Sequence, residues 1–273
     1  KIVVGLVDIL IRDLTADQAK GWLSEMKVSP TTIRNQLNCL SEVIRYSVSR
    51  EYVKDNVLDR LTAGDRRALC GSSEEREPEI LTPKEADRLL VAAVERPELG
   101  LLAAVTLGLF CGIRTEELKR LQWKDVQLDE GFVTISASIA KKRNIRLVEL
   151  SENAKQWLSV CPNRKGAVAR SDSYNDYQKR FHRLLRQAGF VEKDEDGKVV
   201  RIDWKKNGMR HSFGSYHYAL HGESIRTSEQ LGHRNGDVML FSHYRALSTK
   251  KQAAEYFNLT PSASAMKVVA FAS

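Results

Sequence analysis

The chain has 273 residues, enough for two domains of ordinary size at ~100–200 residues each. Hydrophobic residues make up 42% and aromatic residues 7%, so the chain can bury a core and is not expected to be disordered. No apolar run approaches the ~20 residues that cross a bilayer, so no transmembrane helix is expected.

Charge is unevenly distributed along the chain. The formal net charge is +8, yet residues 1–80 carry 12 basic and 13 acidic side chains, whereas residues 81–273 carry 31 and 22. A basic segment of this kind is typical of a protein that binds a polyanion, most often a nucleic acid. A basic protein without such a partner fits the charge alone equally well.

The four cysteines form no Cys-x-x-Cys pair, and no histidine cluster has metal-ligand spacing. We therefore expect reduced thiols, no structural zinc and a cytoplasmic protein. The chain opens on Lys1 rather than on Met, so we expect the natural protein to begin earlier.

The first 65 residues predict a small helical domain. Thr15 is followed three residues later by Gln18, a capping-box pattern that opens a short helix over 15–26. A longer helix is predicted over 31–50, where apolar residues recur at helical spacing: Ile33, Leu37, Leu40, Ile44 and Val48. Arg34 and Arg45 lie on its polar face and are candidate contacts to a DNA backbone, although a solvated helix face is the simpler explanation.

A linker is expected at 66–80, because residues 63–79 lack hydrophobic periodicity and carry Gly, Ser, Pro and mixed charge. Thr82 and Pro83 then supply a helix cap and a first helical residue. A second domain is expected to begin here and to extend over 81–257.

The second domain reads as mainly helical. Three helices are predicted before any strand, at 81–93, 99–110 and 114–123. A strand pair follows at 132–138 and 145–150, on either side of a basic turn at 140–144. Beyond residue 150 the pattern is helical, apart from loops near 161–172 and 192–202 and a tail at 258–273. The sequence therefore predicts a mainly α fold with a small antiparallel β-sheet.

Five short segments of this domain carry the residues with chemical potential: GIRTEEL (112–118), AKKRNIRLVEL (140–150), NGMRHSF (207–213), LGHRN (231–235) and HYRAL (243–247). Each has an ordinary explanation by itself, such as a salt-bridge arginine, a solvent-facing lysine, a helix cap or a half-buried tyrosine. In chain order they supply arginine, lysine, arginine, histidine and tyrosine.

Taken together, these segments resemble the motifs of the tyrosine recombinases, also called the phage integrase family. GIRTEEL and NGMRHSF resemble its two arginine boxes, LGHRN its Leu-Gly-His box and HYRAL its nucleophile box. Residues 31–56 resemble its core-binding domain, and LTPKEADRLL resembles the entry to its catalytic domain. The resemblance implies a helical core-binding domain at 1–65, an α+β catalytic domain at 81–257, and site-specific cleavage and rejoining of double-stranded DNA.

The resemblance also implies a role for each residue. Tyr244 would attack the scissile phosphate, form a 3′-phosphotyrosyl link and release a 5′-hydroxyl. Arg114 and Arg210 would hold the non-bridging oxygens, where charge builds in the transition state. Lys141 would protonate the departing 5′-oxygen, and His233 would hydrogen-bond the phosphate or help to take the tyrosine proton. No metal or cofactor is implied, because the arginines supply the positive charge.

The match departs from the family pattern in one position and leaves others open. Asn207 stands where the family usually has His or Lys; its amide can donate a hydrogen bond to a phosphate but carries no charge or transferable proton. Lys142 is an alternative to Lys141, because neighbours in a strand or tight turn point in opposite directions. The role of His243, which precedes the nucleophile, is open.

Three further residues belong to the expected site or compete with it. Glu117 lies on the same helix face as Arg114 and is expected to support that arginine rather than react. Arg143, in the basic turn, is a candidate DNA contact. Tyr256 is the main rival nucleophile, but its apolar neighbours are typical of a core.

Family behaviour implies a homotetramer on paired DNA sites, acting in the cytoplasm at the nucleoid as the recombinase of an integrating mobile element. Two alternatives stay open. A type IB topoisomerase would use a similar residue set, although the core-binding-like segment speaks against it. A degenerate family member would bind DNA without cutting it, as Asn207 suggests.

Overall fold

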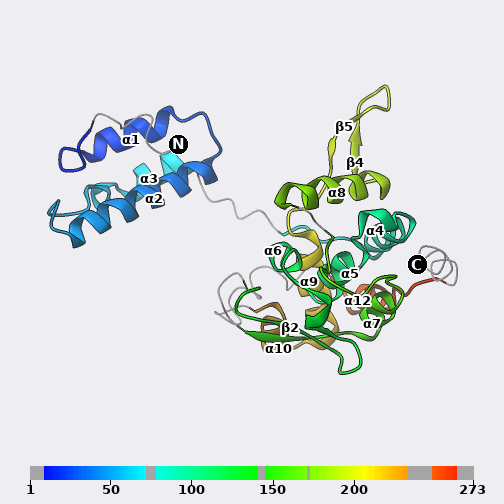
Figure 1. Ribbon diagram of the computed structural model, residues 1–273. Coiled ribbons are helices and arrows are strands. Elements are labelled where there is room, and N and C mark those ends of the chain that lie inside the picture. The colour runs from blue at the N-terminus through cyan, green and yellow to red at the C-terminus, as the bar shows by residue number, and fades with distance from the viewer. Residues whose placement is uncertain (1–8, 72–77, 141–144, 171–172, 233–247, 263–273) are drawn as a thin grey trace. The chain divides into compact units, whose positions relative to one another are not determined.

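The computed structural model describes residues 9–71, 78–140, 145–170, 173–232 and 248–262 (Figure 1). The chain divides into two compact units, Lys1–Arg76 and Glu77–Ser273. Both are built mainly from helices, and the second also carries small antiparallel sheets, which confirms the expected fold class. Within the described ranges, no helix combines the length and apolar character needed to cross a bilayer.

The first unit packs three helices around one core: α1 (Ala16–Glu25), α2 (Pro30–Ser49) and α3 (Ala63–Cys70), with a short 3-10 helix η1 (Val57–Arg60) before the last. The predicted capping box is present, since the Thr15 hydroxyl accepts from the backbone of Gln18 and the Gln18 side chain accepts from that of Thr15. Helix α2 buries its apolar stripe against the other helices. Each buried aliphatic side chain contributes roughly 1.5–3 kcal/mol.

Helix α3 corrects the expected linker at 66–80, because the helix continues to Cys70. A capping box between Thr62 and Asp65 opens α3, and only Leu69 and Cys70 at its end are buried. Two apolar residues are too few to produce a visible periodicity, so the sequence pattern missed the helix.

The second unit is organised around α5 (Leu102–Phe110), in which every residue is buried. This helix packs against three of its neighbours: α4 (Pro83–Glu95), α7 (Glu152–Ser159) and α9 (Gly208–His221). The remaining longer helices are α8 (Tyr174–Gln187), α10 (Ser224–Leu231) and α12 (Lys250–Phe257), and a 3-10 turn η2 (Pro97–Leu99) precedes α5. As predicted, Thr82 caps α4 and Pro83 is its first residue.

The helix expected over 114–123 is shorter than predicted. Only α6 (Thr115–Leu118) is α-helical, and a 3-10 turn η3 (Trp123–Asp125) follows after a gap. The chain leaves the helix to pair with a later segment, since Trp123 N donates to Gly166 O at 2.8 Å and Val168 N donates to Leu121 O at 3.0 Å. This tertiary pairing overrides the local helical pattern.

The predicted strand pair is present within a three-stranded antiparallel sheet of β1 (Val126–Gln127), β2 (Phe132–Ile135) and β3 (Arg146–Glu149). The strands are shorter than expected, and Arg146 pairs with Ile135 at one end of the β2–β3 ladder. Val133, Ile135 and Val148 are buried on one face. Arg146 thus follows Ile145, the first described residue after residues 141–144, which lie outside the described residues.

The expectation of a loop at 192–202 is wrong, because a second hairpin forms there from β4 (Val191–Lys193) and β5 (Val199–Ile202). A tight turn reverses the chain, with Gly197 N donating to Asp194 O at 3.0 Å and Gly197 at a φ of 78°. The turn is so polar that the whole segment was predicted to be a loop, despite the β-branched residues on either side of the turn.

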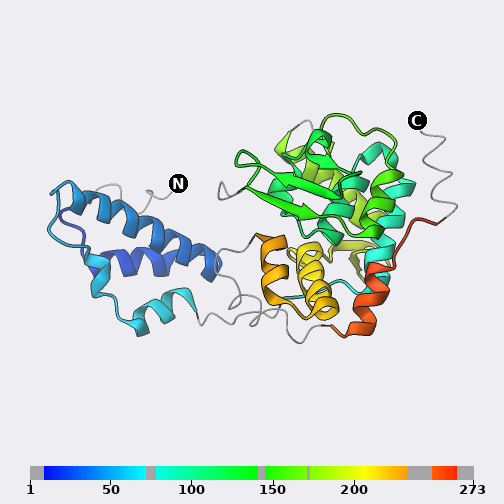
Figure 2. The same ribbon diagram turned by 90° about the horizontal axis from the view of Figure 1, so that it is seen from below.

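Helices α9, α10 and α12 lie together, with α9 packed against the other two, and α10 also contacts β3 (Figure 2). After α12 the chain stays attached, because Leu259 O accepts from Trp157 Nε1 at 2.9 Å and from Asn153 Nδ2 at 3.4 Å. The first residues of the predicted tail therefore pack on α7, and residues 263–273 lie outside the described residues.

Candidate active site

The turn between α5 and α6 sets the position of Arg114. Gly112 has a φ of 61°, and a Cβ there would lie 2.5 Å from Phe213 and 2.7 Å from Leu231, so only glycine fits. The close approach brings the turn against α9 and the end of α10. Arg114 then takes the N-cap position of α6, where its backbone N–H donates to Glu117 Oε2.

Arg210 projects from α9 into the same region and is almost fully buried, with 9% of its surface exposed. Its Nη1 donates to Gly112 O and its Nη2 to Leu231 O, both at 2.6 Å. One guanidinium thereby ties the turn before α6 to the carboxyl end of α10. Two short bonds to backbone carbonyls fix its plane.

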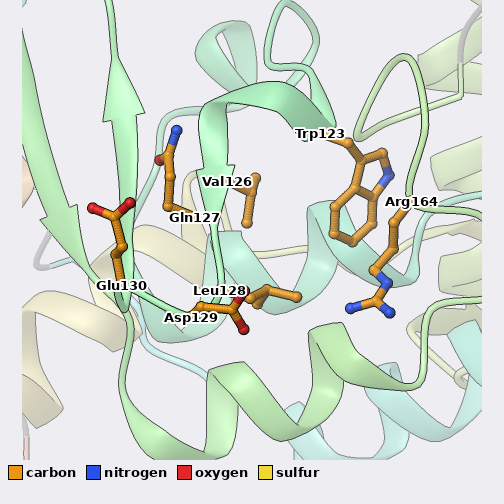
Figure 3. Close-up of a pocket in the computed structure, with 7 residues that line it drawn as sticks. All are labelled: Trp123, Val126, Gln127, Leu128, Asp129, Glu130 and Arg164. Atoms are coloured by element: carbon orange, nitrogen blue, oxygen red, sulfur yellow. The ribbon is translucent and has the colours of Figure 1, made fainter.

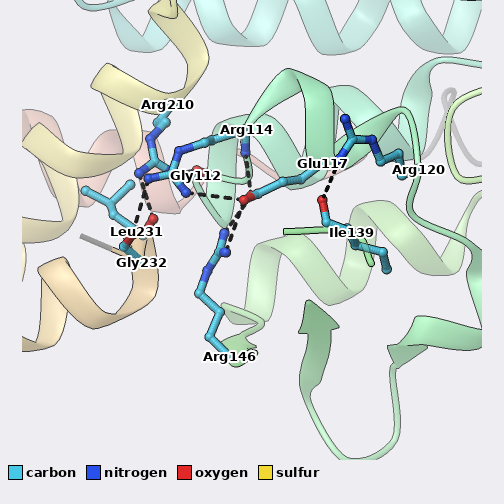
Figure 4. Close-up of polar contacts among 9 residues, drawn as sticks. All are labelled: Gly112, Arg114, Glu117, Arg120, Ile139, Arg146, Arg210, Leu231 and Gly232. Carbon is cyan, nitrogen blue, oxygen red and sulfur yellow. Dashed lines mark hydrogen bonds and ion pairs between the residues drawn. The ribbon is translucent and has the colours of Figure 1, made fainter. Parts of the chain in front are cut away.

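Arg114 reaches the same helix end from the other side (Figure 4). Its Nη2 donates to Gly232 O at 3.2 Å, next to the carbonyl of Leu231 that Arg210 holds. The carboxyl end of a helix carries partial negative charge, which favours cations there. Two arginines separated by almost a hundred residues in sequence are therefore brought together on consecutive carbonyls.

Glu117 is the buried anion of this cluster. Its carboxylate accepts from Arg114 Nη1 at 3.2 Å and from both terminal nitrogens of Arg146, at 3.2 and 2.7 Å. Burial alone would raise the pKa of Glu117, but the hydrogen bonds and charge of Arg146, followed by the charge of Arg114, lower it below its ordinary value. Glu117 therefore stays ionised and pairs with Arg114, the residue that it is expected to support.

Arg146 is the residue that sequence reasoning missed. Its pairing with Glu117 joins segments 29 positions apart. A basic residue in a short strand carries no specific signal by itself. Only the sheet register, which turns Arg146 toward α6, reveals it.

The end of α10 requires a glycine for two reasons. Gly232 caps the helix in the left-handed conformation, with a φ of 65°. A Cβ at this position would also lie 2.9 Å from Cδ and Nε of Arg146. The glycine of the predicted Leu-Gly-His box thus lets Arg146 and Arg114 approach the same backbone.

Asn207 is the N-cap residue of α9. Its backbone is also in the left-handed conformation, with a φ of 56° and a ψ of 21°. Asparagine tolerates this conformation better than most residues with a side chain. The structure therefore gives a backbone reason for asparagine here. Asn207 is exposed and precedes Arg210 by less than one helical turn.

Several predicted site residues lie outside the described residues: Lys141, Lys142, Arg143, His233, His243 and Tyr244. The described chain does reach residues adjoining each of these segments. Ala140 and Ile145 flank the first, Gly232 precedes the second, and Ser248 follows it. Their roles remain predictions.

The rival tyrosine lies in the core. Tyr256 is fully buried, its hydroxyl donates to Leu109 O at 2.7 Å, and its ring stacks on Tyr216 with centroids 4.3 Å apart. Burial raises the pKa of Tyr256 well above its ordinary value. A phenol that is sealed and paired with a carbonyl is unsuited to attack a phosphate.

In the first unit, Arg34 lines a hollow of about 340 Å³ together with Asn38, Arg66 and Arg67. Arg34 donates to Cys70 O at 3.5 Å, and Arg66 donates to Leu58 O at 2.7 Å. Arg45 lies outside this hollow, is exposed and pairs with Glu42 at 2.7 Å. The cationic hollow makes Arg34 a better candidate for a phosphate contact than Arg45.

A separate concavity of about 320 Å³ lies beside β1 (Figure 3). Its lining includes Asp129, Glu130 and Arg164 and shares no residue with the arginine cluster. Two carboxylates make it a poor phosphate site. In the part of the chain that the structure describes, no group of three or more His, Cys, Asp or Glu side chains could hold a metal ion.

A mainly helical unit with a three-stranded antiparallel sheet, in which arginines from two separate boxes meet at one helix end, defines a protein of the tyrosine recombinase class. The profile of the phage integrase family matches residues 79–251. The chain belongs to the phage integrase family.

Individual relatives agree with this assignment. The chain is similar to the tyrosine recombinase XerC of Xanthomonas axonopodis pv. citri, with 28% identity over 201 residues that cover 67% of this chain and 60% of the relative. The chain thus spans less than two thirds of that relative's length.

Solved structures share the fold. The Tn1549 transposon integrase in complex with circular intermediate DNA superposes with a TM-score of 0.64 at 20% identity, covering 90% of this chain and 85% of that one. A lambda integrase tetramer bound to a Holliday junction gives 0.64 at 17% identity, covering 90% and 69%.

Proposed function

We propose that this protein is a site-specific DNA recombinase that cleaves and rejoins double-stranded DNA through a 3′-phosphotyrosyl intermediate on Tyr244. The observation that carries the proposal is the meeting of Arg114 and Arg210 at consecutive carbonyls of residues 231 and 232. Coincidental arginine boxes would have no reason to converge. The next residue in the chain is His233, the predicted histidine of the site.

The chemistry assigned to the site is a balanced transesterification. The Tyr244 oxygen forms a bond to phosphorus as the bond to the 5′-oxygen breaks, and Lys141 gives that oxygen its proton. His233 takes the tyrosine proton or holds a phosphoryl oxygen. Because the new phosphotyrosyl ester keeps the energy of the phosphodiester, the reverse attack by a 5′-hydroxyl rejoins DNA.

The arginines would stabilise the transition state without a metal. Planar, permanently charged guanidiniums suit phosphoryl oxygens, and donors already fixed in place cost no reorganisation during the reaction. A guanidinium has five N–H donors, so Arg114 can keep its bonds to Glu117 and Gly232 and still donate to a phosphate.

The assembly is proposed from the relatives together with the chemistry. Exchange of four strands between two duplexes requires four nucleophiles, and one protein of the same fold is a lambda integrase tetramer bound to a Holliday junction. We infer a homotetramer on paired DNA sites, acting at the nucleoid, with the hollow of the first unit contacting the DNA backbone.

The decisive experiment is covalent capture on DNA. The target site is selected from a random-sequence duplex library by recovering protein-linked fragments, and is then rebuilt as a nicked suicide substrate. We expect a protein–DNA band that disappears in Tyr244→Phe and persists in Tyr256→Phe, the matched tyrosine control.

Two outcomes would contradict the proposal. Tight DNA binding without any covalent product would instead support a binding protein that does not cut. Relaxation of supercoiled DNA without exchange between paired sites would support a topoisomerase.

A further inference from the structure

Arg146 connects three parts of the arginine cluster that are distant in sequence. It begins β3, donates two hydrogen bonds to Glu117 in α6, and packs against Gly232 at the end of α10. Only 11% of its side chain is exposed, against 28% for Arg114. Arg146 is therefore less accessible to a ligand at the surface than Arg114.

The distances show how Glu117 divides its single negative charge. Arg146 binds both carboxylate oxygens, the shorter bond being 2.7 Å, whereas the side chain of Arg114 holds one oxygen at 3.2 Å. Arg146 is thus the main counter-ion, and Arg114 is a weaker second partner. A bidentate pair of this kind also fixes the plane of the carboxylate.

Among the residues that the structure describes, removal of Arg146 would leave Arg114 as the only cation paired with the buried Glu117. An unpaired buried carboxylate is costly, so the Arg114 guanidinium would turn fully onto it. The bond from Arg114 to Gly232 O would then be lost, and its charge would be neutralised before any phosphate arrived.

We propose that Arg146 is a positioning residue that holds the Glu117 carboxylate, so that Glu117 orients Arg114 without neutralising it. The inference rests on the proposed function, since it assigns Arg114 a phosphate to bind. Within the described residues the hydrogen bonds of the Arg146 side chain go to Glu117, and the proposed effect on Arg114 passes through that carboxylate.

Described residues on both sides of 141–144 contact the same region. Arg120 Nη1 donates to Ile139 O at 3.4 Å on one side of residues 141–144, and Arg146 binds Glu117 on the other. A second possible target of the Arg146 substitution is the pair of candidate lysines, which precede Arg146 in the sequence. The test has to separate these two effects.

The test compares two scissile groups in single-turnover cleavage: an ordinary phosphodiester, and a methylphosphonate that lacks the negative charge of one non-bridging oxygen. On the phosphodiester, Arg146→Gln should slow cleavage by about 10- to 100-fold, the usual range for a residue that orients a functional group. On the methylphosphonate the defect should shrink, as it should for Arg114→Ala, because the neutral group needs less cationic stabilisation.

Arg226→Gln is the matched control. It removes another arginine pair between α10 and β3, that of Arg226 with Glu149 at 3.0 Å, without touching Glu117. We expect it to cleave both substrates at the wild-type rate. Arg146→Lys keeps the positive charge but cannot bind both carboxylate oxygens of Glu117 in the bidentate way, so this variant should cleave faster than Arg146→Gln. It also replaces Arg146→Gln in the test if the glutamine variant does not fold.

Three results would overturn the inference. An equal defect on both substrates would mean that Arg146 supports the fold alone. A wild-type rate in Arg146→Gln would mean that it has no role. A defect removed only by a 5′-bridging sulfur, which leaves without a general acid, would place its effect on the lysine instead.

A measurement without DNA separates this inference from the proposed function. In a carbon-13 NMR titration of labelled glutamate, with Glu117→Gln supplying the assignment, Glu117 of Arg146→Gln should titrate at higher pH than in the wild type. An unchanged titration would overturn the inference, even if the wild-type protein never cleaves DNA. Conversely, a shifted titration in a protein that forms no covalent product would leave the carboxylate-holding role intact while the proposed function fails.

Discussion

Arg210 in the second unit and Arg34 in the first are held in opposite ways. In the second unit, Arg210 is buried, and its two terminal nitrogens donate to the backbone carbonyls of Gly112 and Leu231 at 2.6 Å. In the first unit, Arg34 lines an open hollow and has one long contact of 3.5 Å to Cys70 O. The same side chain is thus fixed in one region and loosely held in the other.

The difference separates two uses of positive charge. A guanidinium held by protein acceptors costs little to align when a transition state forms, so it suits chemistry. A loosely held surface arginine releases counterions from DNA and adds affinity that depends on salt, but it determines no reaction. Substitutions in the two units should therefore separate cleavage from binding.

The largest effect is expected from Arg210→Ala. Loss of this guanidinium should reduce single-turnover cleavage by about 10³-fold, the upper range for removal of one transition-state donor, with a much smaller change in DNA affinity. It also leaves the carbonyls of Gly112 and Leu231 without a donor, at a cost of roughly 1–3 kcal/mol each if water does not reach them.

Arg180→Ala is the control for this prediction. Arg180 also lies in the second unit and donates to a backbone carbonyl, Glu98 O at 3.2 Å, but it is outside the arginine cluster. Its loss should leave cleavage unchanged. A comparable fall in cleavage and binding for Arg210→Ala would reduce that residue to an anchoring contact.

An intermediate effect is expected from Glu117→Gln, measured as the free energy of unfolding against pH. At pH 7 the substitution should destabilise the second unit by about 3 kcal/mol, because it leaves two largely buried arginines without a counter-ion. The folded pKa of Glu117 is lowered, so its contribution is present above the unfolded pKa of ~4.3 and is lost as pH falls through the folded pKa. The difference between wild type and variant should therefore shrink on acidification.

Glu149→Gln tests whether this pH dependence belongs to the cluster. Glu149 pairs with Arg226 at the surface, and such exposed pairs contribute about 1 kcal/mol or less. A curve for Glu117→Gln that runs parallel to the wild type down to acidic pH would show that the carboxylate is not held in its charged form.

The smallest effect is expected from Arg34→Ala in the hollow of the first unit. Affinity for DNA should fall by a few fold, and the slope of log K against log salt should become shallower by about 1 for one lost phosphate contact. Cleavage at saturating DNA should not change. Arg12→Ala, an exposed arginine outside the hollow, is the control, and an equal response of both variants would remove the hollow from the DNA-binding surface.

Much of the secondary structure followed from local sequence. Thr15, Thr82 and Pro83 marked helix starts because a side-chain oxygen or a fixed φ acts on its own turn. Helix α3 and the β4–β5 hairpin were missed, since each has few apolar residues in a polar stretch. The helix expected over 114–123 was too long, because pairing with Gly166 and Val168 ends it from outside.

The sequence by itself predicted the fold class, the two arginine boxes, the pairing of Glu117 with Arg114 and the core position of Tyr256, because motif order, periodicity and an apolar neighbourhood are local properties. Tertiary structure alone decided that Arg114 and Arg210 meet at the end of α10 and that Arg146 is the main partner of Glu117. It also supplied the backbone reason for Asn207. Such contacts depend on sheet register and helix packing between segments far apart in the chain, and no spacing within a single segment encodes them.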